Sequence, residues 1–182
     1  MALIYLVRHG KAAGSFTDDL DPGLDELGHS QARAACDILA GKLPLSLASS
    51  PLRRAQETAD PLKSSTSQSV RIENRVAEIP SPGLSLQERG PWLQKVMQGN
   101  WSEQSDALQQ WRKDLAESLV EIDTDTVIFS HFVAINAAVG VAENSDQVYI
   151  FQPNNCSITI FETNGKELKL ISRGDEASTK VN

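Results

Sequence analysis

Short apolar segments recur along this chain, separated by longer segments that have a helical period. Continuous apolar runs of about five residues are typical of strands buried on both faces of a parallel sheet. Two further segments near the C-terminus flank Asn164-Gly165, a dipeptide that favours a tight hairpin turn. The predicted strands are LIYLV (3–7), LSLAS (45–49), VRIENRV (70–76), TVIFS (126–130), SITIFET (157–163) and KELKLIS (166–172).

The segments between these strands predict helices. Ser50-Pro51 predicts the N-cap and first residue of one helix, which ends near Leu62 after Asp60-Pro61 breaks or kinks it. From 79 to 91 the proline and glycine punctuation predicts irregular structure. Helices are further expected over 25–39, with Leu27, Ala34, Ile38 and Leu39 near one face, and over 132–140. Two helical stretches are expected after Pro91, the second over 103–122.

Strands that alternate with helices predict an α/β fold. We expect a three-layer sandwich with a mainly parallel sheet, helices on both faces and a small helical cap, all in a single domain over residues 1–182. Residues 10–23, rich in glycine, serine and aspartate, predict a loop, and residues 79–122 predict the cap insertion. The polar tail from about 174 to 182 is expected to be flexible.

Composition narrows the class of protein. The 182 residues are 40% hydrophobic and 23% charged, ordinary values for a globular protein. The formal net charge of −7 disfavours nonspecific binding to nucleic acid or to an anionic membrane, so an anionic substrate would need a locally positive pocket. We therefore expect no nucleic-acid partner and no membrane partner. The sequence favours no particular oligomeric state.

The two cysteines indicate the compartment. Cys36 and Cys156 lie far apart and outside any CxxC pattern, which argues against a disulfide scaffold or a structural zinc site. The N-terminus has no signal-peptide pattern, and no apolar run approaches the roughly 20 residues that span a bilayer. We expect a cytoplasmic protein.

Three predicted strands end in reactive or cationic residues. LIYLV leads into Arg8-His9, LSLAS leads through Ser50 to Arg53-Arg54, and TVIFS leads into His131. Parallel strands bring their carboxyl ends to one edge of the sheet, where ligands bind in such folds. We therefore expect these side chains to meet, although they are far apart in the chain.

Two histidines beside two arginines suit phosphate chemistry. Arginine forks match phosphate oxygens, and nearby guanidinium charge keeps a histidine neutral and nucleophilic. A neutral histidine nitrogen can attack phosphorus and form a phosphohistidine, which divides one displacement into two easier steps. Gly10 is expected to let the backbone approach the ligand. This scheme requires no metal and no cofactor, and the acidic run 18–21 is interpreted as a solvated loop rather than a calcium site.

The chain resembles the histidine phosphatase superfamily, also called the phosphoglycerate mutase-like family. The resemblance covers most of the chain, in the family's order and spacing. It lies in LVRHGKA (6–12), LDELGHSQA (24–32), SSPLRRAQETA (49–59), AEI (77–79), FSHFVAINA (129–137) and NCSITIFE (155–162).

The resemblance implies roles for five residues. His9 matches the phosphorylated nucleophile, and Arg8, Arg54 and His131 match the groups that bind the phosphoryl group. Glu78 aligns with the usual proton donor to the leaving group. Arg54 is preferred to its neighbour because it directly precedes an alanine, as in the family pattern.

Other candidates receive structural interpretations. Arg53 is expected to be a surface or rim charge, His29 a surface residue, and the two cysteines small core residues. Phe132 stands where many family members have glycine, which predicts an aromatic ring at the pocket wall and favours an apolar group beside the phosphate. The segment expected to cap the site is shorter than in mutases, which favours hydrolysis over mutase activity.

The sequence thus predicts a metal-independent phosphatase that hydrolyses a small phosphomonoester through a phosphohistidine on His9, with Glu78 as proton donor. Two alternatives stay open. One is a phosphohistidine protein phosphatase, a group that looks similar at its histidine motifs but tends to lack the glutamate donor. The other is a non-catalytic phosphate-binding regulatory module.

Overall fold

The computed structural model describes residues 1–177 and is built on a six-stranded sheet with the order β3-β2-β4-β1-β5-β6. The pairs β1–β4, β2–β4 and β2–β3 are parallel, and β1–β5 and β5–β6 are antiparallel. This confirms the mainly parallel sheet and the C-terminal hairpin. The strands are β1 (Ala2–Arg8), β2 (Ser46–Ser49), β3 (Arg71–Ile72), β4 (Thr126–Ser130), β5 (Ile158–Thr163) and β6 (Leu168–Ser172).

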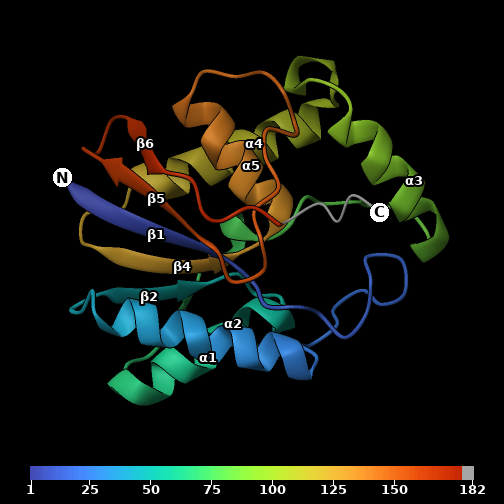
Figure 1. Cartoon of the computed structure of the whole chain (residues 1–182). Helices are drawn as coiled ribbons and strands as arrows, with labels where there is room; N and C mark the ends of the chain where they lie inside the picture. Colours follow the sequence, from blue (N-terminus) through green and yellow to red (C-terminus); the bar gives the residue numbers. More distant parts are fainter. Residues whose placement is uncertain (178–182) are drawn as a thin grey trace.

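Helices cover both faces of the sheet and confirm the three-layer arrangement. In Figure 1, α1 and α2 lie below the sheet, α4 and α5 lie above it, and α3 lies to one side, towards the ends of β2 and β4. Of the helices among residues 1–177, none has the length and apolarity that crossing a bilayer requires. The helices are α1 (Glu26–Ala40), α2 (Arg53–Thr66), α3 (Leu86–Met97), α4 (Asp106–Val120) and α5 (Phe132–Ala142), with 3-10 turns η1 (Asn74–Val76) and η2 (Trp101–Glu103).

Alternating side chains of the central strands fill two cores. Leu6 of β1 and Ile128 of β4 pack with α4 and α5, whereas Val7 and Phe129 pack with α1 and α2. Both faces of these strands are therefore apolar, which is why their sequences read as continuous hydrophobic runs. This burial fixes the direction of the strands and thus the place where each strand ends.

The segment expected to form the cap, 79–122, divides in space. Leu108, Leu115 and Leu119 of α4 are buried in the core beside α5, so this helix belongs to a layer of the sandwich. The part that lies beyond the strand ends is α3 with the residues before it.

The expected buried face of α1 was wrong except for Leu39. Leu27 and Ile38 are 52% and 61% exposed, and the buried residues are instead Gly28, Ala32, Ala35 and Leu39. The helix packs on α2, where Ala55 and Ala59 are also buried. Small side chains let the two helices approach closely, so this contact uses alanines rather than the larger apolar residues.

Two helix boundaries differ from the expectation. Ser50 and Pro51 precede α2, which begins at Arg53 and continues through Pro61 to Thr66. Leu62 is buried beyond the proline, and this packing keeps the helix intact despite the missing hydrogen bond.

Helix α3 begins at Leu86, within a stretch expected to be irregular. Ser85 and Glu88 form a capping box, in which the Ser85 amide donates to the Glu88 carboxylate over 2.8 Å. The capping box stabilises the start of the helix, which continues through Pro91.

The start of the C-terminal tail, expected to be flexible from 174, is hydrogen-bonded. The Ala177 amide donates to the Gln152 carbonyl over 2.9 Å, and the Asn154 amide donates to the Asp175 carbonyl over 2.8 Å. Residues 178–182, the rest of that expected tail, lie outside the described residues.

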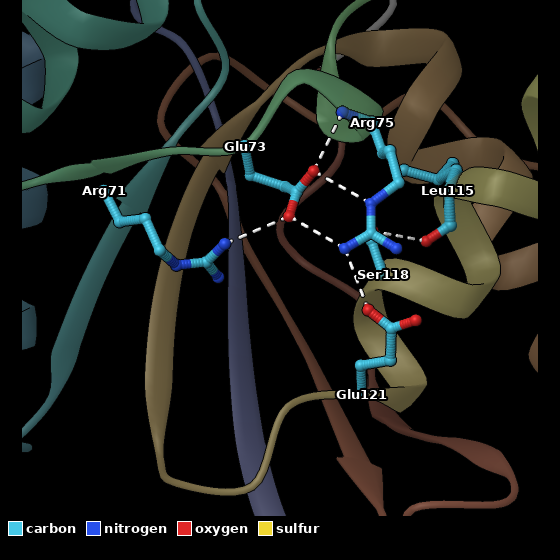
Figure 2. Close-up of polar contacts among 6 residues, drawn as sticks. All are labelled: Arg71, Glu73, Arg75, Leu115, Ser118 and Glu121. Atoms are coloured by element: carbon cyan, nitrogen blue, oxygen red, sulfur yellow. Dashed lines mark hydrogen bonds and ion pairs between the residues drawn. The ribbon is translucent and has the colours of Figure 1, made fainter.

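A buried carboxylate ends β3 early and fixes the chain that leads to Glu78. Glu73 accepts hydrogen bonds from the Arg75 amide and guanidinium and from the Arg71 guanidinium, at 2.9 to 3.1 Å (Figure 2). The bond to the amide starts the turn η1, so the strand predicted over 70–76 stops at Ile72. Arg75 also pairs with Glu121 of α4.

The Glu73 carboxylate should contribute to stability. Its hydrogen bonds to Arg75 lower its pKa from the usual 4.5 to about 2. A lowered pKa stabilises the folded state fully above pH 4.5, and this contribution is lost as the pH falls towards 2. We expect Glu73→Gln to lower the free energy of unfolding by roughly 1.5–3 kcal/mol at pH 7, measured by urea denaturation, with a smaller difference at pH 3.

Glu121→Gln is the matched control for this measurement. Its side chain is 60% exposed and its ion pair with Arg75 is solvated, so the loss should stay below about 1 kcal/mol. Equal losses in both variants, or no dependence on pH, would contradict the importance of the Glu73 contacts.

Candidate active site

A cavity of about 390 Å³ opens beyond the carboxyl ends of β1 and β2. Strand β1 runs into Arg8 and His9, and main-chain bonds from His9 to Ser130 and from Ser50 to Phe129 continue the parallel pairing past the strand ends. Four of the five predicted site residues line this cavity: Arg8, His9, Arg54 and Glu78. The fifth, His131, is fully buried and does not line it, but its ring centroid is 5.2 Å from that of His9.

Two neighbours set the tautomer of His9. Its Nδ1 lies 2.7 Å from the Gly10 carbonyl oxygen, which can only accept, so Nδ1 carries the proton. The Nε–H of Arg54 points at His9 Nε2 over 3.2 Å, and a guanidinium can only donate. His9 is therefore held as the neutral Nδ1–H tautomer, with a lone pair on Nε2.

The charge state of His9 follows from its surroundings. Burial, together with the positive charges of Arg54 and Arg8, lowers the pKa of His9 from its usual 6.5 to about 3, although the hydrogen bond to Gly10 opposes this shift. An imidazole in this setting stays neutral across the physiological pH range.

Arg54 is buried and Arg8 is partly buried, and neither is in contact with a carboxylate of the described residues. Within residues 1–177, neither guanidinium forms an ion pair with a carboxylate within 4 Å. Arg8 donates from Nη1 to the Pro153 carbonyl over 2.7 Å, while its buried Nε has no partner. Burial lowers the pKa of both arginines, yet guanidinium keeps its proton in proteins. The cavity floor is thus positively charged although the chain as a whole is acidic.

Ser50 holds the second histidine. Its Oγ lies 2.7 Å from His131 Nε2 and also accepts from the Leu52 amide over 3.2 Å. The bond between Nε2 and this hydroxyl is compatible with either ring tautomer of His131, and Nδ1 has no hydrogen-bond partner among the described residues. Burial, followed by His9 and the two arginines, lowers the pKa of His131 well below its usual value.

Glu78 joins the cavity wall to the start of α5. Its carboxylate accepts from the Val133 amide over 3.1 Å and from the Ile79 amide over 3.0 Å. Burial raises the pKa of Glu78, while these bonds and the charges of Arg54 and Arg8 oppose that rise. A carboxyl group with a raised pKa beside a cavity is suited to hold and release a proton.

Close packing of two glycines shapes the backbone after His9. A Cβ on Gly10 would lie 2.6 Å from the Gly28 carbonyl oxygen, and a Cβ on Gly28 would overlap the Lys11 backbone. Gly10 is therefore required by the contact with α1. The Gly10 amide also donates to Thr58 Oγ1 of α2, over 3.0 Å.

The remaining expectations have mixed outcomes. Arg53 is exposed and pairs with Glu57 over 2.7 Å, and His29 is also exposed, as predicted. Phe132 lines the cavity, as predicted, with the Arg8 guanidinium 5.1 Å from its ring centroid. Cys36 and Cys156 are free thiols that are only partly buried rather than core residues.

Sequence reasoning missed two residues that shape the site. Ser50 was interpreted as a helix cap, although it bonds His131. Asn155 lines the cavity and donates from Nδ2 to the His9 carbonyl over 3.0 Å. Both belong to stretches that carry the family resemblance, SSPLRRAQETA and NCSITIFE, which was the available signal.

The fold and the site define an α/β protein that gathers two neutral histidines and two unpaired arginines at the carboxyl edge of its sheet. A sequence model of the histidine phosphatase superfamily (branch 1) matches residues 4–176. The chain belongs to this superfamily.

Several relatives are similar to this chain. Glucosyl-3-phosphoglycerate phosphatases from Mycolicibacterium vanbaalenii and Mycobacterium tuberculosis are 42% and 40% identical over 79 residues, which is 41% of this chain. The match spans only 35% of the length of these curated relatives.

Solved structures share the fold along nearly the whole chain. The Entamoeba histolytica phosphoserine phosphatase, in complex with 3-phosphoglyceric acid, has a TM-score of 0.75 at 22% identity and covers 96% of this chain and 98% of its own. A mycobacterial glucosyl-3-phosphoglycerate phosphatase has a TM-score of 0.73 at 22% identity and covers 97% and 100%.

The charge state of His9 can be measured by nitrogen-15 NMR of the histidine side chains. At pH 6 we expect a neutral ring protonated on Nδ1, because its pKa is about 3. Arg54→Met should raise this pKa by removing a nearby positive charge, while burial keeps it below 6.5. Arg53→Met, one residue away and exposed, should leave it unchanged. A charged ring at pH 6 in the unaltered protein would contradict the assignment.

Proposed function

We propose that the protein is a metal-independent phosphatase that hydrolyses a small phosphomonoester through a phosphohistidine on His9. The observation that supports this most strongly is the neutral imidazole with its Nε2 lone pair beside buried Arg54 and partly buried Arg8, neither of which has a carboxylate partner within residues 1–177. Buried positive charge without a counter-ion is unfavourable, and a bound phosphate would supply the missing negative charge. The two free thiols agree with the reducing conditions of a cytoplasmic protein.

In the first step, the lone pair of His9 Nε2 attacks phosphorus and the bond between phosphorus and the alcohol oxygen breaks. Glu78, in its carboxylic acid form, gives its proton to that oxygen, so the product leaves as a neutral alcohol. The ring becomes positively charged while phosphorylated, and the bond from Nδ1–H to the Gly10 carbonyl stabilises that charge. Arg8 and Arg54 bind the phosphoryl oxygens, and His131, with its ring centroid 5.2 Å from that of His9, completes the set.

In the second step, water attacks the phosphohistidine. The Glu78 carboxylate takes the proton of the water, the bond from nitrogen to phosphorus breaks, and inorganic phosphate forms. His9 returns to its neutral tautomer and Glu78 is again protonated, so the cycle closes without an added reactant.

The presence of Glu78 favours an ester as the substrate. An alkoxide is a poor leaving group and needs a proton, whereas the nitrogen of a phosphohistidine needs little help. The relatives named above act on phosphomonoesters, a class that we extend to this chain as part of the proposal.

The intermediate can be trapped directly. We expect acid-labile phosphate on His9 after rapid mixing with an aryl phosphate and quenching in base, and none in His9→Ala. Label found by mass spectrometry on another residue, or its persistence in the variant, would contradict the role of His9. Phosphate binding without turnover or label would instead indicate a regulatory binding module.

The role of Glu78 can be tested with two substrates. Glu78→Gln removes the proton donor and should lower kcat/KM for an alkyl phosphate by about 10²-fold or more. Turnover of phosphoramidate should change little, because its nitrogen leaves readily. An equal loss on both substrates would indicate that Glu78 acts only through its bonds to the start of α5.

A further inference from the structure

We propose that the alcohol portion of the substrate is apolar and carries no second anionic group. This inference rests on the proposed function, because it concerns the part of the cavity beyond the phosphoryl group. It follows from two independent properties of the residues that line the cavity.

The first property is the apolar wall. Part of the cavity lining comes from the loop after β1, with Phe16 and Leu20, and another part comes from α3, with Leu93 and Met97. Phe132 from α5 extends the wall and stacks on the partly exposed Tyr149 with centroids 6.1 Å apart. Leu20 is 67% exposed. An apolar ligand that covers such an exposed apolar side chain removes its surface from water, and this burial favours binding.

The second property is that the cavity lining, within residues 1–177, offers no further cation for a second anion. The cavity-lining cations are Arg8, Arg54 and Lys11. Both arginines are assigned to the phosphoryl group, and the Lys11 ammonium is 3.0 Å from the Asp25 carboxylate. An exposed aspartate, Asp19, also lines the cavity and would repel a carboxylate on the substrate.

Arg89 of α3 is a further cation that must be considered as a binding partner for a substrate carboxylate. It is buried, its Nη1 has no hydrogen-bond partner, and it lies close enough to Arg54 to lower the pKa of that residue. Its guanidinium carbon, however, lies 3.8 Å from the ring centroid of Phe16, and its Nε donates to Ser81 Oγ. Phe16 lines the cavity and Arg89 does not. The ring therefore covers the cation and presents an apolar surface to the substrate.

Straight-chain alkyl phosphates test the apolar wall, because their leaving groups have nearly the same acidity from ethyl to hexyl phosphate. Each buried methylene should raise kcat/KM by about fourfold until the wall is covered. Leu20→Ser should reduce the ratio of hexyl to ethyl phosphate turnover by about threefold to tenfold. Ethyl phosphate reports whether the phosphoryl site is intact. Leu27→Ser is the matched control, because Leu27 is similarly exposed but does not line the cavity.

A hexyl phosphate with a terminal carboxylate tests the second property. We expect its kcat/KM to be at least about tenfold below that of hexyl phosphate, in the unaltered protein and in Arg89→Met alike. A preference for the carboxylate compound that disappears in Arg89→Met would overturn the inference, as would equal turnover from ethyl to hexyl phosphate. Failure to hydrolyse any of these esters, with no label on His9, would instead overturn the proposed function and this inference with it.

Discussion

The hydrogen bond from His9 Nδ1–H to the Gly10 carbonyl is the interaction on which the site depends. It fixes the ring proton on one nitrogen and so leaves Nε2 with its lone pair beside the Arg54 guanidinium. A free imidazole would exchange tautomers and take up a proton near pH 6.5, and either change would remove the lone pair. The backbone that supplies this carbonyl is held by the close packing of Gly10 on Gly28 and by the bond to Thr58. The position of one nitrogen thus depends on Gly28 of α1 and Thr58 of α2, two residues that do not line the cavity.

Burial and charge act together at the cavity floor. The apolar strands that drive folding end where Arg8 and His9 begin, so the desolvation that stabilises the sheet also lowers the pKa of His9. The same desolvation makes two unpaired guanidiniums unfavourable in the free protein. We infer that part of the folding free energy supports a site that becomes electrostatically complete only with a bound anion. Preorganised charge of this kind is the principal means of catalysis in phosphoryl transfer.

The sequence predicted the strands that lead to the candidate site better than the elements around them. Strands β1, β2 and β4 and the residues after them were evident because continuous apolar runs are local features. The buried face of α1 was missed because alanine contacts with α2 depend on a partner that the periodicity of one helix does not reveal. The start of α3 was obscured by Pro91, although its capping box was visible in SLQE. The contacts of Ser50 with His131 and of Arg89 with Phe16 join distant segments, so only the fold brings them together.

The central claim is that His9 Nε2 attacks phosphorus while Arg8 and Arg54 bind its oxygens. A crystal structure with orthovanadate, which adopts the trigonal bipyramidal geometry of the transition state, tests it most directly. The account predicts a bond from Nε2 to vanadium, Nδ1 still bonded to the Gly10 carbonyl, and both guanidiniums on the vanadate oxygens. Vanadate bonded through a different side chain, or held in the cavity without contact to either arginine, would contradict it.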